Sequence, residues 1–116
     1  MKTQILIATA ALALGGCATV QIPPDRLEHA QASERGANEL GAQSVPQAKL
    51  HLQYAKDETE AARRLAKAGD ENAILMMARA EADAELALAL AREEQTKTQA
   101  RLALETLDQL RARETP

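Results

Sequence analysis

Aromatic side chains are almost absent from this chain, which contains no Trp and no Phe and has Tyr54 as its only Tyr. The chain is also acidic, with a formal net charge of −3. Both features argue against nucleic-acid binding, which uses basic patches and stacking aromatic rings. Hydrophobic residues make up 46% of the chain, but Ala supplies about half of them. Because Ala favours helices and buries little surface, we expect good helices around a thin core.

Cysteine is equally scarce, since Cys17 is the only one and has no partner for a disulfide within the chain. It follows an uncharged, mostly apolar run at residues 5–14, with Lys2 before the run and two glycines after it. This order is typical of a secretory signal peptide. The run of about ten residues is too short to cross a bilayer, which needs about 20. The alternative, a short core helix of a cytosolic protein, does not explain why all these features occur together.

The residues at the end of the run, Leu14-Gly15-Gly16-Cys17, resemble the lipobox of bacterial lipoproteins. The resemblance implies cleavage between Gly16 and Cys17 and acylation of Cys17, which would then contact membrane lipid. Ala18 stands where Asp would retain a lipoprotein in the inner membrane, so the resemblance implies an outer-membrane location. We therefore predict a signal peptide at residues 1–16 and a lipidated cysteine with its tether at residues 17–23.

Residues 24–116 are predicted to form one all-α domain, divided by proline and glycine into three helices. We expect these helices at about 24–40, 45–68 and 71–113. Ser44 and Gln47 match a capping box at the start of the second helix. Gly69 suits the end of that helix and Asp70 the N-cap of the next. A connection this short predicts an antiparallel hairpin with a long C-terminal helix, accompanied by a shorter N-terminal helix.

Small residues at heptad-like spacing predict how the hairpin packs. In the second helix they are Ala48, Leu52, Ala55, Thr59, Ala62 and Ala66, and in the third they are Met77, Ala80, Ala84, Ala87 and Ala91. These two Ala-rich seams are expected to pack together like a coiled coil.

The third helix also has a second apolar face, on roughly the opposite side. It comprises Ala78, Ala82, Leu86 and Ala89, and it continues through Ala100, Leu104, Leu107 and Leu110. We expect the first helix or another chain to cover this face. Which of them does so depends on whether residues 41–44 fold the chain back or let the first two helices run end to end. Leu104, Leu107 and Leu110 form the possible partner face, for an envelope protein or for self-association.

No arrangement of side chains in the sequence suggests catalysis. His29 and His51 are far apart and lack nearby sequence partners for a metal site, and the glycines form no phosphate-binding loop. We therefore expect neither an enzyme nor a metal, a cofactor or a small-molecule substrate.

The stretch from Leu27 to about Gln99 resembles the domain-of-unknown-function 4398 family of bacterial lipoproteins. The matching features are Gly41-Ala42, Pro46 with Ala48 and Leu50, Ala66 with Gly69, and the block from Ala82 to Ala87. The resemblance implies no catalytic residues, and the peptidoglycan-binding domain of some relatives is not expected in a chain ending at Pro116. The expected function is a structural or protein-interaction role in the cell envelope. The alternative is an oligomeric coiled-coil spacer between the outer membrane and peptidoglycan.

Overall fold

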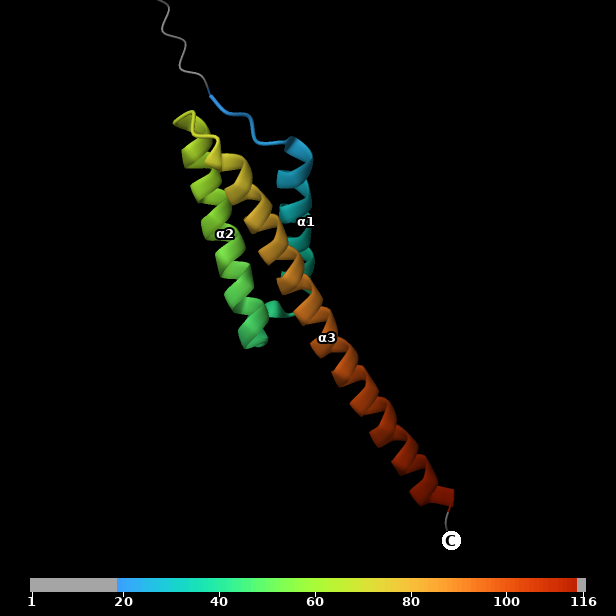
Figure 1. The fold of residues 1–116 in the computed structure, drawn as a ribbon. Helices are drawn as coiled ribbons and strands as arrows, with labels where there is room; N and C mark the ends of the chain where they lie inside the picture. The colour runs from blue at the N-terminus through green and yellow to red at the C-terminus, as the bar shows by residue number, and fades with distance from the viewer. Residues whose placement is uncertain (1–18, 115–116) are drawn as a thin grey trace, which may run out of the picture.

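The computed structural model of the chain describes residues 19–114, and this part consists of helices joined by short turns, without strands. Its elements are α1 (Pro24–Glu39), the short 3-10 helix η1 (Ala42–Ser44), α2 (Pro46–Lys67) and α3 (Asn72–Glu114). Figure 1 shows α2 and α3 as an antiparallel hairpin, with α1 beside α3 and running in the same direction. The predicted all-α hairpin with a long last helix and a shorter first one is confirmed.

Proline and glycine set the helix boundaries, as expected. Pro24 and Pro46 each open a helix, where the missing N–H of proline costs little. Gly41 and Gly69 have φ angles of 81° and 76°, a backbone conformation that side-chain-bearing residues rarely adopt. At the start of α3 the Asn72 N–H donates to Asp70 Oδ1 at 2.9 Å, so the predicted cap at Asp70 is confirmed.

The predicted capping box at Ser44 is wrong. Val45, not Ser44, occupies the N-cap position of α2, and no side chain caps this end. Ser44 belongs to η1, and its backbone N–H donates to the Gly41 oxygen at 2.9 Å. Because Pro46 has no N–H to satisfy, the helix loses little by starting without a side-chain cap.

The core lies between the three helices and consists almost entirely of alanine. All of the predicted seam residues are buried, including Thr59 in α2 and Met77 in α3. Leu52 and Met77 are the only large side chains among the fully buried residues. Small side chains let helix axes approach to about 8 Å, so the seams provide close contact and little apolar volume. The coiled-coil-like packing of Ala-rich seams is thus confirmed.

The first helix does not cover the second apolar face of α3. The chain turns back at Gly41 and η1, and α1 packs into the same groove as α2, with Ala30 and Ala37 fully buried. A Cβ at Gly36 would lie 3.1 Å from Leu88 Cδ1, so the glycine permits this close approach. Of the two arrangements that the sequence left open, the structure shows the one in which the chain folds back and α1 packs beside the hairpin. The helix therefore neither runs on along α3 nor covers its second apolar face.

The described chain enters at one end of the bundle and leaves far from the other. The Val20 N–H donates to the Ala66 oxygen at 3.1 Å, next to the turn between α2 and α3, and Ile22 packs against the core. With 43 residues α3 is about 65 Å long, against about 33 Å for the 22 residues of α2. About half of α3 therefore projects beyond the bundle (Figure 1). None of the described helices is long and apolar enough to cross a membrane.

Candidate interaction surface

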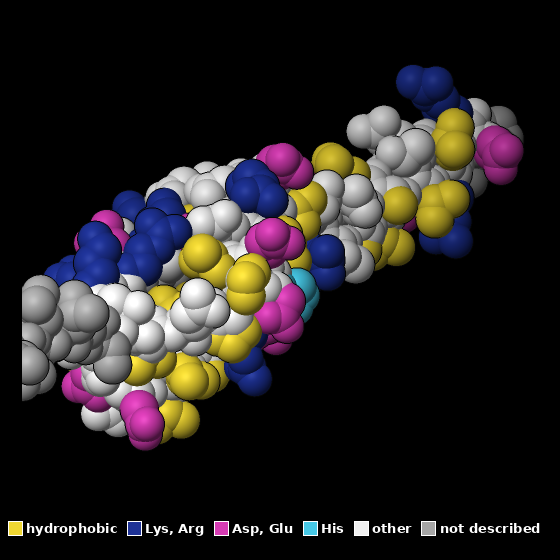
Figure 2. Space-filling model, turned by 90° about the horizontal axis from the view of Figure 1, so that it is seen from above, with side chains coloured by type: hydrophobic (Ala, Val, Ile, Leu, Met, Phe, Trp, Pro, Cys, Tyr) yellow, Lys and Arg dark blue, Asp and Glu magenta, His cyan; other side chains and the backbone are white. Residues whose placement is uncertain are grey.

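The side of α3 that faces away from α1 and α2 forms an exposed apolar strip, which we call the outer face. Its members are Leu75, Ala78, Ala82, Leu86, Ala89, Ala100, Leu104, Leu107 and Leu110, interrupted by Glu93 and Thr96. They recur every three or four residues, which keeps them on one side of a helix. Figure 2 shows hydrophobic side chains lying open among charged ones along the projecting end of the molecule.

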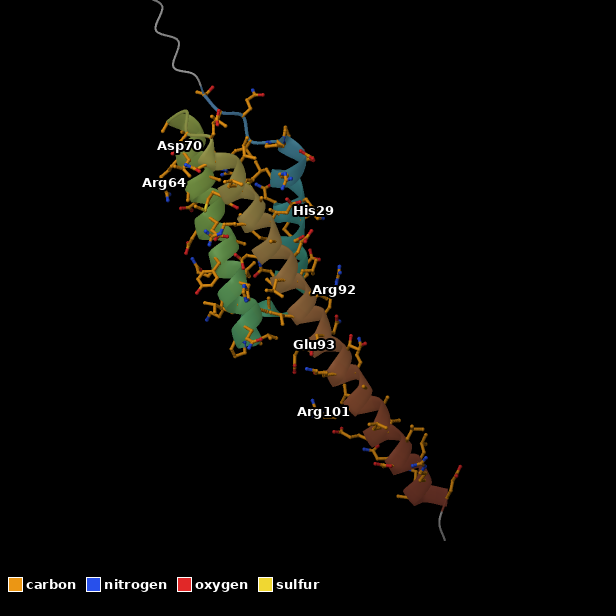
Figure 3. The ribbon with its side chains drawn as sticks, in the orientation of Figure 1. His29, Arg64, Asp70, Arg92, Glu93 and Arg101 are labelled. Atoms are coloured by element: carbon orange, nitrogen blue, oxygen red, sulfur yellow. The ribbon has the colours of Figure 1, made fainter. Side chains whose placement is uncertain are left out.

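The projecting part of α3, residues 92–114, carries the predicted partner residues, and we call it the tail. Every residue from 99 to 114 is exposed. The exposed fractions are 63% for Leu104, 48% for Leu107 and 50% for Leu110. Figure 3 shows Arg101 on this projecting segment, past the ends of α1 and α2. The structure thus places the three predicted residues together on an open surface.

The opposite side of the tail behaves differently. Continuing the buried seam beyond Ala91 at the same spacing leads through Gln95, Thr98, Leu102, Glu105 and Gln109. Apart from Leu102 this side becomes polar at the point where α1 and α2 end. The outer face instead stays apolar, and leucine becomes more frequent on it in the tail, where Leu104, Leu107 and Leu110 follow Ala100. A tail that served only as a solvated extension has no physical need for leucines on one chosen side.

Within the bundle the outer face carries mostly small side chains, and it is also exposed to solvent. Leu75 is 66% exposed and Leu86 is 42% exposed, while the small residues Ala82 and Ala89 are exposed and Ala78 is half-buried. The strip therefore extends along nearly the whole of α3, and the tail leucines are one end of it.

A polar cluster that the sequence did not reveal joins α1 to α3. His29 Nδ1 lies 3.0 Å from Glu81 Oε1 and 3.3 Å from Glu85 Oε1, and Arg26 Nη1 lies 3.1 Å from Glu81 Oε2. Figure 3 shows His29 on α1, near α3. The only available signal was the pair of glutamates one helical turn apart on α3. These contacts fix the axial position of α1 relative to α3.

A second polar cluster joins α2 to α3. His51 Nδ1 lies 2.6 Å from Asp83 Oδ1, and Arg79 Nη2 lies 3.1 Å from Glu58 Oε1. The side chain of Glu58 is only 14% exposed, and burial followed by the nearby Asp83 raises its pKa above the ordinary glutamate value. Both clusters lie at the flanks of the groove, so they hold helices together and leave the outer face open.

Four predicted site residues, Leu14, Gly15, Gly16 and Cys17, lie outside the described residues. No family model, no curated protein and no solved structure matches this chain. The lipobox and the family resemblance therefore stay predictions from the sequence, and the outer face is the candidate site that the structure itself supplies.

Proposed function

We propose that the protein is a lipoprotein on the periplasmic side of the outer membrane, anchored through acylated Cys17 and acting by protein interaction or structural support without catalysis. The observation that carries this proposal is the placement of the only cysteine, directly after an apolar run and two glycines. A thiol at this place has no disulfide partner, and acylation gives it a function. Membership of the domain-of-unknown-function 4398 family is part of the same proposal and rests on the matching residues alone.

The geometry of the described part fits an anchored molecule. Val20 is hydrogen-bonded to the end of α2, and it lies three positions after Cys17. Three extended residues reach about 10 Å, so the lipid anchor would hold this end of the bundle at the membrane surface. The tail, at the opposite end, would present its leucines up to about 65 Å away. The anchor and the candidate partner surface thus lie at opposite ends.

The alternative of an oligomeric spacer reaching toward peptidoglycan uses the same length of α3. Light scattering on detergent-solubilised protein separates the two, because a bundle that works as a monomer or a dimer supports an interaction module. A stable trimer supports the coiled-coil rod.

Replacing the cysteine tests the anchor directly. Cys17→Ala is expected to abolish incorporation of labelled palmitate and to release or mislocalise the protein, whereas Thr19→Ala, two residues away, should do neither. If Cys17→Ala still fractionates with the outer membrane at the normal level in high salt, the proposal is wrong.

A further inference from the structure

We infer that a second copy of the chain packs antiparallel along the outer face of α3, with the twofold axis near Glu93. The tail of each copy then lies on the bundle half of the other copy. This inference rests on the proposed interaction role, for which it names the partner. It places the two anchored N-terminal ends at opposite ends of the pair, so a dimer held by both anchors would lie along the membrane surface.

The two halves of the outer face complement each other in size. In the antiparallel arrangement Ala78 of one copy meets Leu107 of the other, Ala82 meets Leu104, and Leu86 meets Ala100. Leu75 and Leu110 meet at the two ends. Because each of these three layers pairs a large side chain with a small one, the axis separation is similar in both halves of the contact. The central layers are polar or small, with Ala89 against Thr96 and Glu93 against Glu93.

A parallel, in-register pair would fit poorly. It would place Leu104 on Leu104 and Leu107 on Leu107 in the tail, but Ala78 on Ala78 and Ala82 on Ala82 in the bundle. The helices would be held apart at one end and drawn together at the other, leaving gaps that cost contact energy. The order of small and large residues along α3 therefore favours the antiparallel copy.

The charges flanking the outer face support the same arrangement. In an antiparallel pair the same flank of each helix faces itself, which brings Arg79 near Asp108 of the second copy. Within one copy Arg79 pairs with Glu58 and Asp108 with Arg111, but both side chains remain well exposed, at 69% and 77%, so each can make a second contact. Near the axis the two Glu93 side chains approach each other, but Lys97 Nζ lies 2.6 Å from Glu93 Oε1 within each copy and offsets the repulsion.

The length of the contact is sufficient for association. From Leu75 to Leu110 the two helices would overlap over about 54 Å, which exceeds the roughly 33 Å of α2 that the hairpin uses. The two halves of the face cannot cover each other within one chain, because both lie on one continuous helix. In a twofold dimer the tail of each copy covers the bundle half of the other copy, so the contact is self-complementary.

Disulfide trapping tests this arrangement on the full protein purified in mild detergent and treated with copper phenanthroline. The test variant carries Ala78→Cys and Leu107→Cys, positions about 43 Å apart on one rigid helix, so a disulfide between them must join two copies. We expect a covalent dimer in high yield from this double variant and little from either single variant. The control variant carries Ala78→Cys and Leu102→Cys, with the second cysteine on the other side of the tail, and should not cross-link.

Two results would overturn the inference. Efficient cross-linking of the single Leu107→Cys variant would show a parallel pair, and absence of cross-linking in the double variant would show no such dimer. Circular dichroism checks that each variant keeps its helicity. The unsubstituted protein serves as the blank: a cross-link through Cys17 would contradict the proposed lipidation. Sequencing of the cross-linked peptides separates that result from the 78–107 disulfide.

Discussion

The two halves of α3 belong to one uninterrupted helix, yet only one of them is packed. In the first half, Ala80, Ala84 and Ala87 are fully buried by two neighbouring helices. From residue 99 onward nothing covers either side of α3, and the larger side chains, Leu104 and Leu107, are open. Apolar content therefore does not decide burial in this chain. What decides it is whether a neighbouring helix lies alongside.

The largest expected effect concerns the packed half, where a single leucine supplies much of the apolar volume. Leu52→Ala should lower the free energy of unfolding by about 2–5 kcal/mol, because it leaves a cavity among alanines that cannot fill it. Leu50→Ala is the matched control, since Leu50 is 48% exposed on the same helix. Urea denaturation of both variants measures the difference, and equal losses would mean that Leu52 is not the centre of the core.

Enlarging the Ala seam should cost somewhat less. Ala84→Leu is expected to destabilise the bundle by roughly 1–3 kcal/mol, because the added volume forces apart helices that small residues hold close. Arg79→Leu should cost less, although Arg79 pairs with Glu58 and is an imperfect control. Ala32→Leu, on the exposed side of α1, is the cleaner comparison. Equal melting temperatures for Ala84→Leu and Ala32→Leu would contradict the Ala-seam packing.

Glu58, at the polar flank of the packed half, should make the stability of the bundle depend on pH. The folded chain raises the pKa of Glu58, mainly through burial, so it holds this proton more tightly than the unfolded chain does. The resulting stabilisation is present at low pH and is lost as the pH rises from the ordinary glutamate pKa through the raised one. Glu58→Gln removes this titration, so wild type should lose stability relative to the variant as the pH rises above the ordinary glutamate pKa of about 4.3.

A pH-independent difference between wild type and Glu58→Gln would show that Glu58 has an ordinary pKa in the folded chain. Denaturation curves at several pH values provide this measurement. Glu60→Gln, on the exposed side of α2, is the matched control.

The smallest effect on folding is expected in the tail. Leu104→Asp with Leu107→Asp should change the unfolding free energy of the bundle by less than about 0.5 kcal/mol, because neither side chain touches it. The same double variant should abolish self-association or partner capture. Leu102→Asp with Gln109→Asp adds equal charge on the other side of the tail and should preserve association. Retention of every envelope contact by the Leu104 and Leu107 variant would remove the assigned role of the outer face.

The hairpin was predictable because its signals are local. Gly69 and Asp70 define the turn by their own backbone and capping preferences, and the spacing of Ala48 to Ala66 defines which side of α2 is buried. Periodicity also identified the outer face of α3 correctly.

What lies against each face could not be predicted in the same way. The sequence shows two apolar sides on α3, but the turn at Gly41 decides that α1 enters the groove with α2. The contacts of His29 with Glu81 and of His51 with Asp83 depend on how the helices slide and rotate against each other, and no local pattern encodes that. The capping box at Ser44 was predicted wrongly because the same residues can also form a 3-10 turn, and Ser44 lies in η1.

The hydrogen bond from Val20 to Ala66 has a mechanical consequence. The N-terminal end of the described chain is hydrogen-bonded to the end of the bundle, and α3 is continuous from there to Glu114. A change in the tilt of the bundle at Val20 therefore moves the whole of α3. A rotation of roughly 10° at that end would carry the far end of a 65 Å arm through about 11 Å. Small changes in tilt at the N-terminal end therefore become displacements of about two helical turns at Leu110.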